Sequence, residues 1–249
     1  MAALDAVIFD LGNTLIYFDG DWSQVYTQAD IELARFLQAA GLNLDEHRFL
    51  DEFRTRLDRY HNERESEFIE YTTAHILRTL LNEWGFSEIS DEIITSGLEV
   101  MYRVSQAHWK PEEDALPTIR KLRAQGYRLG LISNAADDAD VHTLVDKANL
   151  RRYFEIILSS AAAGIRKPHP EIFQRALSAL KTTPSRTAMV GDTLEADLLG
   201  AQNAGMVGIW ITRRVETLDS RSETESIKPD AVIKRLSELP EVLEKFKGQ

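Results

Sequence analysis

The sequence predicts an α/β fold: a Rossmann-like, doubly wound parallel sheet core with an inserted four-helix cap domain. A β-branched strand opens the chain, strands and amphipathic helices alternate after Pro111, and apolar residues at helical spacing fill the segment from about Asp30 to Ala107. Alternating strands and helices are typical of a parallel sheet with helices on both faces. We therefore expect a core of residues 1–16 and 111–249, and a helical cap of residues 17–110.

The elements are expected in the following order. The first strand is the β-branched and aromatic run Asp5–Asp10, which stops at a Gly12-Asn13 turn. Four apolar stripes at helical spacing then form the cap, and Gly41 and Gly85 end two of these helices. In the second half, strands are expected at 127–132, 155–159, 187–190, 206–211 and 231–233, and helices at 118–124, 140–148, 170–180, 194–204 and 237–246. Residues 212–229, rich in Ser, Thr, Glu and Arg, are expected to form an exposed loop.

The composition excludes several classes of protein. The 249 residues include no cysteine, which excludes a disulfide scaffold, a thiol nucleophile and a cysteine-based zinc site. The net charge is −11, most of it within 17–110, so the chain lacks the basic surface of a nucleic-acid binder. No apolar run is long enough to span a membrane, and the first residues carry no basic segment of a secretion signal. We expect a cytoplasmic protein with neither nucleic-acid nor membrane partners.

Polar residues that could take part in catalysis or ligand binding follow several predicted strands. Four sites lie at or just beyond a strand's carboxyl end, where ligands bind in such sheets: Asp10, Ser133, Ser159–Ser160 and Asp192. Two neighbouring carboxylates repel each other unless one is protonated or a cation lies between them. Oxygen ligands together with a substrate phosphate are how Mg²⁺ is usually held. With Lys167 as a point charge and Ser133 as a hydroxyl donor, the set suits phosphoryl transfer.

The order, spacing and types of these residues resemble the haloacid dehalogenase (HAD) superfamily, whose members are mostly phosphatases. The resemblance covers essentially the whole chain, including a helical cap inserted after the first motif. Its most specific parts are Gly191-Asp192-x4-Asp197 and Lys167-Pro168-x-Pro170. Each motif alone is weak, but four in the family's order leave little room for coincidence.

The resemblance implies catalytic roles at the matching positions. Asp10 would be the nucleophile and form an aspartyl-phosphate intermediate. Ser133 and Lys167 would hold the phosphoryl oxygens and offset charge in the transition state. Asn134 would contact the phosphate or the substrate.

The resemblance also implies a Mg²⁺ site. Its ligands would be Asp10, Asp192 and the backbone carbonyl of Gly12. Asp197 would not touch the metal but would orient Asp192, Lys167 or a metal-bound water.

The sequence departs from the family pattern at Gly12. Phosphatases of the family usually carry Asp-x-Asp at the first motif, and the second Asp is the general acid/base. Gly12 has no proton to give, and Asn13 does not titrate. Such assistance is typically worth ~10²–10⁴-fold, so we expect a slower enzyme that favours good leaving groups such as acyl phosphates or sugar 1-phosphates. Asp19, Asp21 or a water molecule are the candidate substitutes.

Three functions remain open at this stage. The favoured one is a Mg²⁺-dependent phosphatase of a small phosphorylated metabolite, acting as a monomer or homodimer. The second is a phosphate- or partner-binding protein with little turnover. The third is a 2-haloacid dehalogenase; that class also lacks the second Asp but usually has Tyr there, works without metal and has a different fourth motif. The Gly191-Asp192-x4-Asp197 motif is the metal-binding version and argues against the third.

The cap residues carry weaker signals. The net negative charge of the cap, residues 17–110, favours substrates with one phosphate over nucleotides and bisphosphates. The aromatic residues Trp22, Trp84 and Trp109 are expected in the cap's core. The basic run Arg54, Arg56, Arg59 and Arg64 alternates with acidic residues, so we expect a solvated helix face.

Overall fold

A six-stranded parallel sheet lies at the centre of the computed structural model, which describes residues 3–215 and 227–246, with the backbone alone for 63–67. Its strand order is β5-β4-β1-β6-β7-β8. The strands are β1 (Ala6–Phe9), β4 (Arg128–Ser133), β5 (Ile156–Ser159), β6 (Thr187–Gly191), β7 (Val207–Ile211) and β8 (Ala231–Ile233). The chain leaves β1 in one direction for β4 and β5, then returns to the other side of β1 for β6, β7 and β8. This reversal makes the carboxyl ends of β1, β4 and β6 the expected ligand-binding edge.

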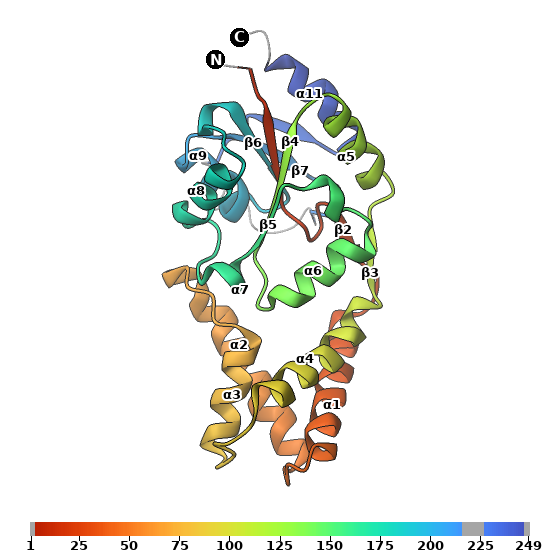
Figure 1. The fold of residues 1–249 in the computed structure, drawn as a ribbon, viewed down its shortest axis with the longest axis vertical. Coiled ribbons are helices and arrows are strands. Elements are labelled where there is room, and N and C mark those ends of the chain that lie inside the picture. Colours follow the sequence, from red (N-terminus) through yellow and green to blue (C-terminus); the bar gives the residue numbers. More distant parts are fainter. Residues whose placement is uncertain (1–2, 216–226, 247–249) are drawn as a thin grey trace.

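Helices cover both faces of the sheet, as the alternating pattern predicts (Figure 1). Val7 and Phe9 of β1 join the apolar cluster with α5 (Ala115–Ala124), α6 (Asp138–Lys147) and α11 (Leu239–Lys245). Ala6 and Ile8 face the opposite side and join the cluster with α8 (Pro170–Ala179) and α9 (Gly200–Asn203). Because successive side chains of a strand point to opposite faces, β1 is buried on both. The Rossmann-like fold is thus confirmed.

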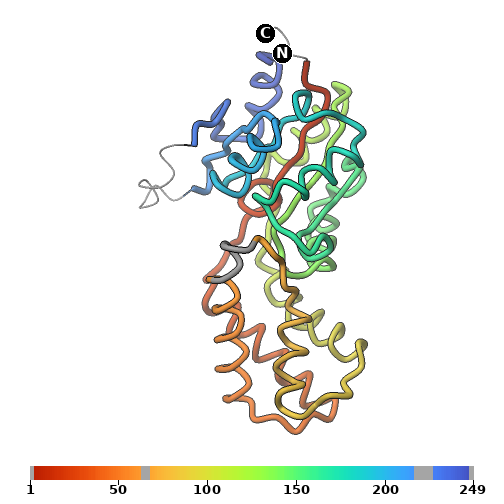
Figure 2. The backbone as a smooth tube through the Cα atoms, turned by 90° about the vertical axis from the view of Figure 1, so that its left-hand side faces the viewer, coloured from red at the N-terminus to blue at the C-terminus, as the bar shows by residue number. Residues whose placement is uncertain are grey.

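Four helices form a separate layer below the sheet (Figures 1 and 2). They are α1 (Trp22–Ala39), α2 (Glu46–Glu67), α3 (Thr73–Glu83) and α4 (Asp91–Gln106). Their inner faces have an apolar core of their own, with Leu33, Phe49 and Leu77 fully buried. The first helix begins earlier than expected, because the Asp21 carboxylate accepts a hydrogen bond from the backbone N–H of Gln24 at 2.9 Å and caps the helix there. No helix in the described ranges is long and apolar enough to cross a membrane.

A second, two-stranded sheet was not predicted. Strand β2 (Ile16–Phe18) leads into the helical layer and β3 (Trp109–Pro111) leads out of it, and the two pair antiparallel. Each has three residues and lacks a long β pattern, so only the tertiary pairing of distant segments reveals it.

Local geometry differs from expectation in a few other places. The helix expected at 194–204 is a π-helical segment, Leu194–Leu199, followed by the short α9. The last helix begins as a 3₁₀ turn, Leu236–Glu238. A short helix, α7 (Ser160–Ala163), follows β5 and was not predicted. The middle of the expected loop 212–229 lies outside the described residues.

Candidate active site

A cavity of about 610 Å³ lies between the four-helix layer and the carboxyl ends of the central strands. Parallel strands bring their carboxyl ends to one edge, so residues distant in sequence meet there. The sequence-predicted site residues all line this cavity: Asp10, Gly12, Ser133, Asn134, Lys167, Asp192 and Asp197.

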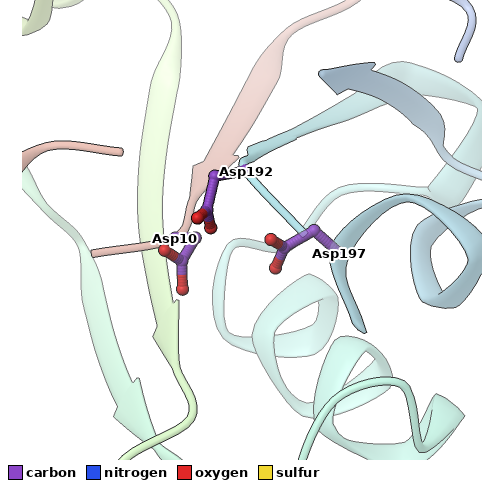
Figure 3. A group of neighbouring side chains, drawn as sticks. All are labelled: Asp10, Asp192 and Asp197. Atoms are coloured by element: carbon purple, nitrogen blue, oxygen red, sulfur yellow. The ribbon is translucent and has the colours of Figure 1, made fainter. Parts of the chain in front are cut away.

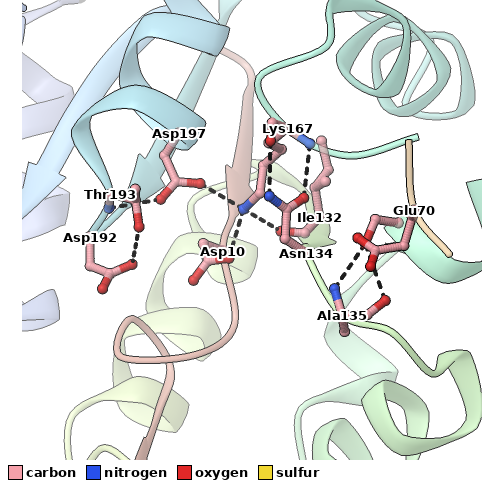
Figure 4. A network of polar contacts seen from close by, with 10 residues as sticks. Asp10, Glu70, Ile132, Asn134, Ala135, Lys167, Asp192, Thr193 and Asp197 are labelled. Carbon is pink, nitrogen blue, oxygen red and sulfur yellow. Dashed lines mark hydrogen bonds and ion pairs between the residues drawn. The ribbon is translucent and has the colours of Figure 1, made fainter. Parts of the chain in front are cut away.

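The ammonium group of Lys167 lies at the centre of the site. It donates to Asp10 Oδ1 at 2.7 Å, to Asp197 Oδ1 at 2.6 Å and to the carbonyl of Ile132 at 3.0 Å (Figure 4). All three N–H donors are therefore used, and the side chain is only 2% exposed. Burial by itself lowers the pKa of Lys167, but the charges of Asp10 and Asp197 outweigh it and hold the pKa above its usual value. Lys167 is a fixed cation that orients both carboxylates.

Asp10, Asp192 and Asp197 form an acidic cluster with carboxylate oxygens within 4.8 Å of one another (Figure 3). Burial raises the pKa of Asp10 to about 7, with added repulsion from Asp197 and Asp192 and against the attraction of Lys167. Burial also raises the pKa of Asp192 to about 6, with repulsion from Asp197, although Asn13 and Thr193 donate hydrogen bonds to it. Three carboxylates face one ammonium, so the cluster has an excess of negative charge. Close oxygen ligands with this excess fit a hard divalent cation.

Asp197 is held by a glycine and by backbone. Its second oxygen accepts from the N–H of Thr193 at 3.0 Å, while the first accepts from Lys167. The carboxyl group packs directly on Gly191, where a Cβ atom would lie 2.2 Å from Asp197 Oδ2. The glycine of the Gly191-Asp192 motif is thus required by the close approach of Asp197.

The side-chain amide of Asn134 makes two hydrogen bonds with the backbone of Lys167. Its Nδ2 donates to the Lys167 carbonyl at 2.9 Å, and its Oδ1 accepts from the Lys167 N–H at 2.8 Å. These two hydrogen bonds join the loop after β4 to the loop that carries Lys167. The geometry gives Asn134 a positioning contact that sequence reasoning did not foresee; its predicted phosphate contact stays a prediction.

Gly12 lies beneath an aromatic ring. A Cβ atom at this position would lie 3.4 Å from Cη2 of Trp109, which reaches the cavity from β3. Trp109 was expected in the cap's core, and it instead lines the cavity beside the first motif. Of the two candidate substitute acids, Asp19 pairs with Lys110 and Asp21 caps α1. Neither is among the described residues that line the cavity.

The cap side of the cavity corrects two other expectations. Arg54 does not lie on a solvated face: it lines the cavity and pairs with the buried carboxylate of Asp30. Its guanidinium also lies over the ring of Tyr26, 5.5 Å from the centroid. Trp22 is 42% exposed and stacks on Phe18, so it is not a core residue either.

The structure also shows where the remaining tryptophan and two of the remaining arginines of the cap lie. Trp84 packs against the cap's apolar core as expected. Arg56 pairs with Glu83 and Arg59 is exposed, whereas the side chain of Arg64 lies outside the described part.

These observations define a class: a doubly wound α/β protein with a helical layer over its sheet, and a buried aspartate, a lysine and an acidic cluster suited to a metal ion at the sheet's carboxyl edge. A sequence model of the haloacid dehalogenase-like hydrolases matches residues 4–205. The chain belongs to this family of hydrolases, as the motifs predicted.

Proteins similar to this chain are named for different activities. A glyceraldehyde 3-phosphate phosphatase of Methanopyrus kandleri is 28% identical over 96% of this chain and 97% of its own. The pyrophosphatase PpaX of Bacillus mycoides is 32% identical over 55% of this chain and 61% of its own. A crystal structure titled 2-haloacid dehalogenase, from Pseudomonas syringae pv. Tomato DC3000, is 30% identical, covers 99% of this chain and 100% of that chain, and has a TM-score of 0.69.

Proposed function

We propose that the protein is a Mg²⁺-dependent phosphatase that hydrolyses a small phosphorylated metabolite through a phosphorylated Asp10. The observation that carries this proposal is the contact of Lys167 with both Asp10 and Asp197 beside the carboxylate of Asp192. The relatives named as phosphatases support the same chemistry.

In the first step a carboxylate oxygen of Asp10 attacks phosphorus, and the bond from phosphorus to the ester oxygen breaks. Lys167 holds Asp10 in the attacking orientation and offsets the negative charge that gathers on the phosphoryl oxygens. Ser133, buried at the end of β4, provides a hydroxyl donor to the same oxygens. Water then attacks the aspartyl phosphate at phosphorus, releases inorganic phosphate and restores the Asp10 carboxylate.

The residues that would hold Mg²⁺ are Asp10, Asp192 and the backbone carbonyl of Gly12. When bound, the ion neutralises the excess carboxylate charge and polarises the phosphoryl group. Asp197 is already engaged by Lys167 and by the N–H of Thr193, so it orients its neighbours and leaves the ion to the other two carboxylates.

The departing oxygen receives its proton from water in this proposal. Gly12 offers no titratable group, and Asp19 and Asp21 are engaged elsewhere. Without a protein acid, a leaving group of low pKa departs more readily than a simple alcohol. Acyl phosphates and sugar 1-phosphates are therefore the favoured substrates.

The charges of the cavity favour a substrate with one phosphate. The arginine and lysine residues that line its described part are Arg54, Arg166 and Lys167, and each faces a carboxylate. A second phosphate group would thus meet no arginine or lysine there that lacks a carboxylate neighbour. This argues for a substrate without a second phosphate group and against pyrophosphate, the substrate class suggested by one relative's name.

The cap is proposed to span residues 17–110, with residues 1–16 and 111–249 as the core. Both crossings between them then lie in the β2–β3 ladder, which pairs Tyr17 with Lys110. A short ladder at both crossings is suited to act as the hinge on which a cap opens and closes.

The test is phosphate release from a panel of acetyl phosphate, sugar 1-phosphates, glyceraldehyde 3-phosphate and pyrophosphate, each with Mg²⁺ and with EDTA. We expect Mg²⁺-dependent release, fastest from acetyl phosphate and sugar 1-phosphates and slowest from pyrophosphate. Release that persists in EDTA would contradict the metal requirement, and a preference for pyrophosphate would contradict the substrate class.

Dehalogenation is the second candidate, because the relative from Pseudomonas syringae carries that name and Gly12 lacks the acid of the phosphatases. The same preparation is incubated with 2-chloropropionate and assayed for chloride. Chloride release without phosphatase activity would favour the dehalogenase, and neither product from a folded protein would favour the binding-protein alternative.

A further inference from the structure

The cap touches the core at a second place, away from the β2–β3 ladder. The junction between α2 and α3 lies against α7 and the loop that follows it, on the opposite side of the molecule from β2 and β3 (Figure 1). The Arg166 N–H donates to the Phe68 carbonyl at 3.0 Å, and the Glu70 N–H donates to the Gly164 carbonyl at 3.2 Å. An antiparallel bridge pairs Ile69 with Ile165 between them.

The Glu70 carboxylate lies at the centre of this contact, and its side chain is fully buried. One oxygen accepts from the Tyr60 hydroxyl of the cap at 2.5 Å. The other accepts from the Ser160 hydroxyl of the core at 2.6 Å and lies 3.4 Å from Nη1 of Arg166. The carboxylate is thus paired on both sides of the boundary between cap and core.

Both core partners contact or adjoin the segments that carry Asn134 and Lys167. The Ser160 hydroxyl accepts from the N–H of Ala135, the residue after Asn134, at 2.9 Å. Arg166 immediately precedes Lys167, and Asn134 and Lys167 bind each other as described above. The Glu70 carboxylate is therefore linked to both segments. It reaches the neighbour of Asn134 through Ser160, and it contacts Arg166, the neighbour of Lys167.

We propose that Glu70 is a positioning residue, which fastens the closed cap to the segments bearing Asn134 and Lys167 and so completes the phosphate site when the cap closes. The inference rests on the proposed phosphatase function for its catalytic consequence. A buried charged contact suits this role, because the favourable pairing is largely offset by loss of hydration. Opening the cap returns Glu70, Ser160 and Arg166 to water, so the contact selects one arrangement without locking it.

The experiment compares wild type with Glu70→Ala, Glu70→Gln and the control Glu88→Ala, an exposed cap carboxylate in the turn before α4. Two readouts need no turnover: the radius of gyration from solution X-ray scattering, and the affinity for orthovanadate with Mg²⁺ by calorimetry. For Glu70→Ala we expect a larger radius of gyration and at least tenfold weaker vanadate binding. Glu70→Gln keeps one acceptor oxygen and should fall between, and Glu88→Ala should match wild type.

The kinetic signature is a rise in KM larger than the fall in kcat for acetyl phosphate, since an opened cap weakens binding before it affects the attack. Ser160→Ala removes a core partner and no cap atom, and should shift vanadate affinity in the same direction. It also keeps the test decisive if Glu70→Ala does not fold.

Wild-type scattering and vanadate affinity in the folded variants would overturn the proposal. The scattering comparison does not depend on catalysis. Failure of wild type to release phosphate would therefore count against the proposed function and not against this contact.

Discussion

Lys167 Nζ lies 2.7 Å from Asp10 Oδ1, in a pair with side chains 2% and 11% exposed. Lys167→Met removes the buried cation and leaves Asp10 and Asp197 facing each other. Breaking a buried pair in this way typically costs about 3–5 kcal/mol of the free energy of unfolding. We expect a loss in that range by urea denaturation in EDTA, and a fall of at least about 100-fold in phosphate release with Mg²⁺. A variant with wild-type stability and rate would show that the lysine is not the organising charge.

Gly191 is required by packing, because its α-carbon is covered by the Asp197 carboxyl group. Gly191→Ala places a methyl group 2.2 Å from Asp197 Oδ2, so the carboxylate must leave Lys167. We expect about 1–3 kcal/mol lower stability and at least tenfold lower activity. The matched control is Gly208→Ala on the next strand, where the nearest atom to the new Cβ is at an ordinary 3.4 Å. Equal effects at the two positions would contradict the specific role of the Gly191–Asp197 contact.

Gly12→Asp restores the carboxylate usual in phosphatases of this family. Trp109 lies 3.4 Å from the position of the new Cβ, so the first side-chain atom fits beside the ring. General acid assistance helps poor leaving groups most. We therefore expect a rise of about tenfold or more for alkyl phosphates such as glycerol phosphate, and little change for acetyl phosphate. Gly12→Asn has the same size without a titratable proton, and an equal gain in that variant would refute the explanation.

The pH dependence of stability can be tested at Asp140, which lines the cavity from α6. Burial raises the pKa of this carboxyl to about 6, against a hydrogen bond from Gln106 Nε2 at 2.8 Å. The folded protein holds this proton more tightly than the unfolded chain, whose ordinary pKa is 3.8. The contribution to stability is therefore full below about pH 4 and is lost as the pH rises through about 6.

Asp140→Asn removes this titration and keeps an acceptor for Gln106. At pH 7 the variant should be more stable than wild type by about 1–2 kcal/mol in urea denaturation. At pH 4 the difference should vanish, because the wild-type carboxyl is then protonated in the folded state. A variant that is less stable at pH 7 would refute the raised pKa.

The half of the cavity formed by the sheet could be predicted from the sequence, because its signals are local. Asp10, Ser133 and Asp192 follow buried strands, and a parallel sheet brings such ends together whatever the rest of the chain does. The roles expected for Lys167 and Asp197 come from the resemblance of the motifs around them to the haloacid dehalogenase superfamily. The fold class followed from the same alternation of strands and helices.

The cap half could not be predicted, because it depends on how one layer is oriented on the other. In the sequence, Arg54 alternates with acidic residues, which is typical of a solvated helix face. In the fold, α1 places Asp30 beside it, and the two side chains pair. Trp109 matches a core aromatic, but the β2–β3 pairing places its ring over Gly12. Glu70 follows a long charged helix, and only the fold buries it against Ser160. A single sequence holds no local signal for these tertiary contacts.

The most direct test of the central claim is inorganic phosphate release by Asp10→Asn and wild type, with Mg²⁺ and acetyl phosphate, in protein shown to be folded. Asparagine keeps the shape of the side chain but cannot form the phosphoryl intermediate. We expect phosphate release by the variant to fall to the uncatalysed background, a loss of at least about 10⁴-fold given the scale of enzymatic acceleration. A folded Asp10→Asn variant that retained a substantial part of the wild-type rate would show that Asp10 is not the nucleophile.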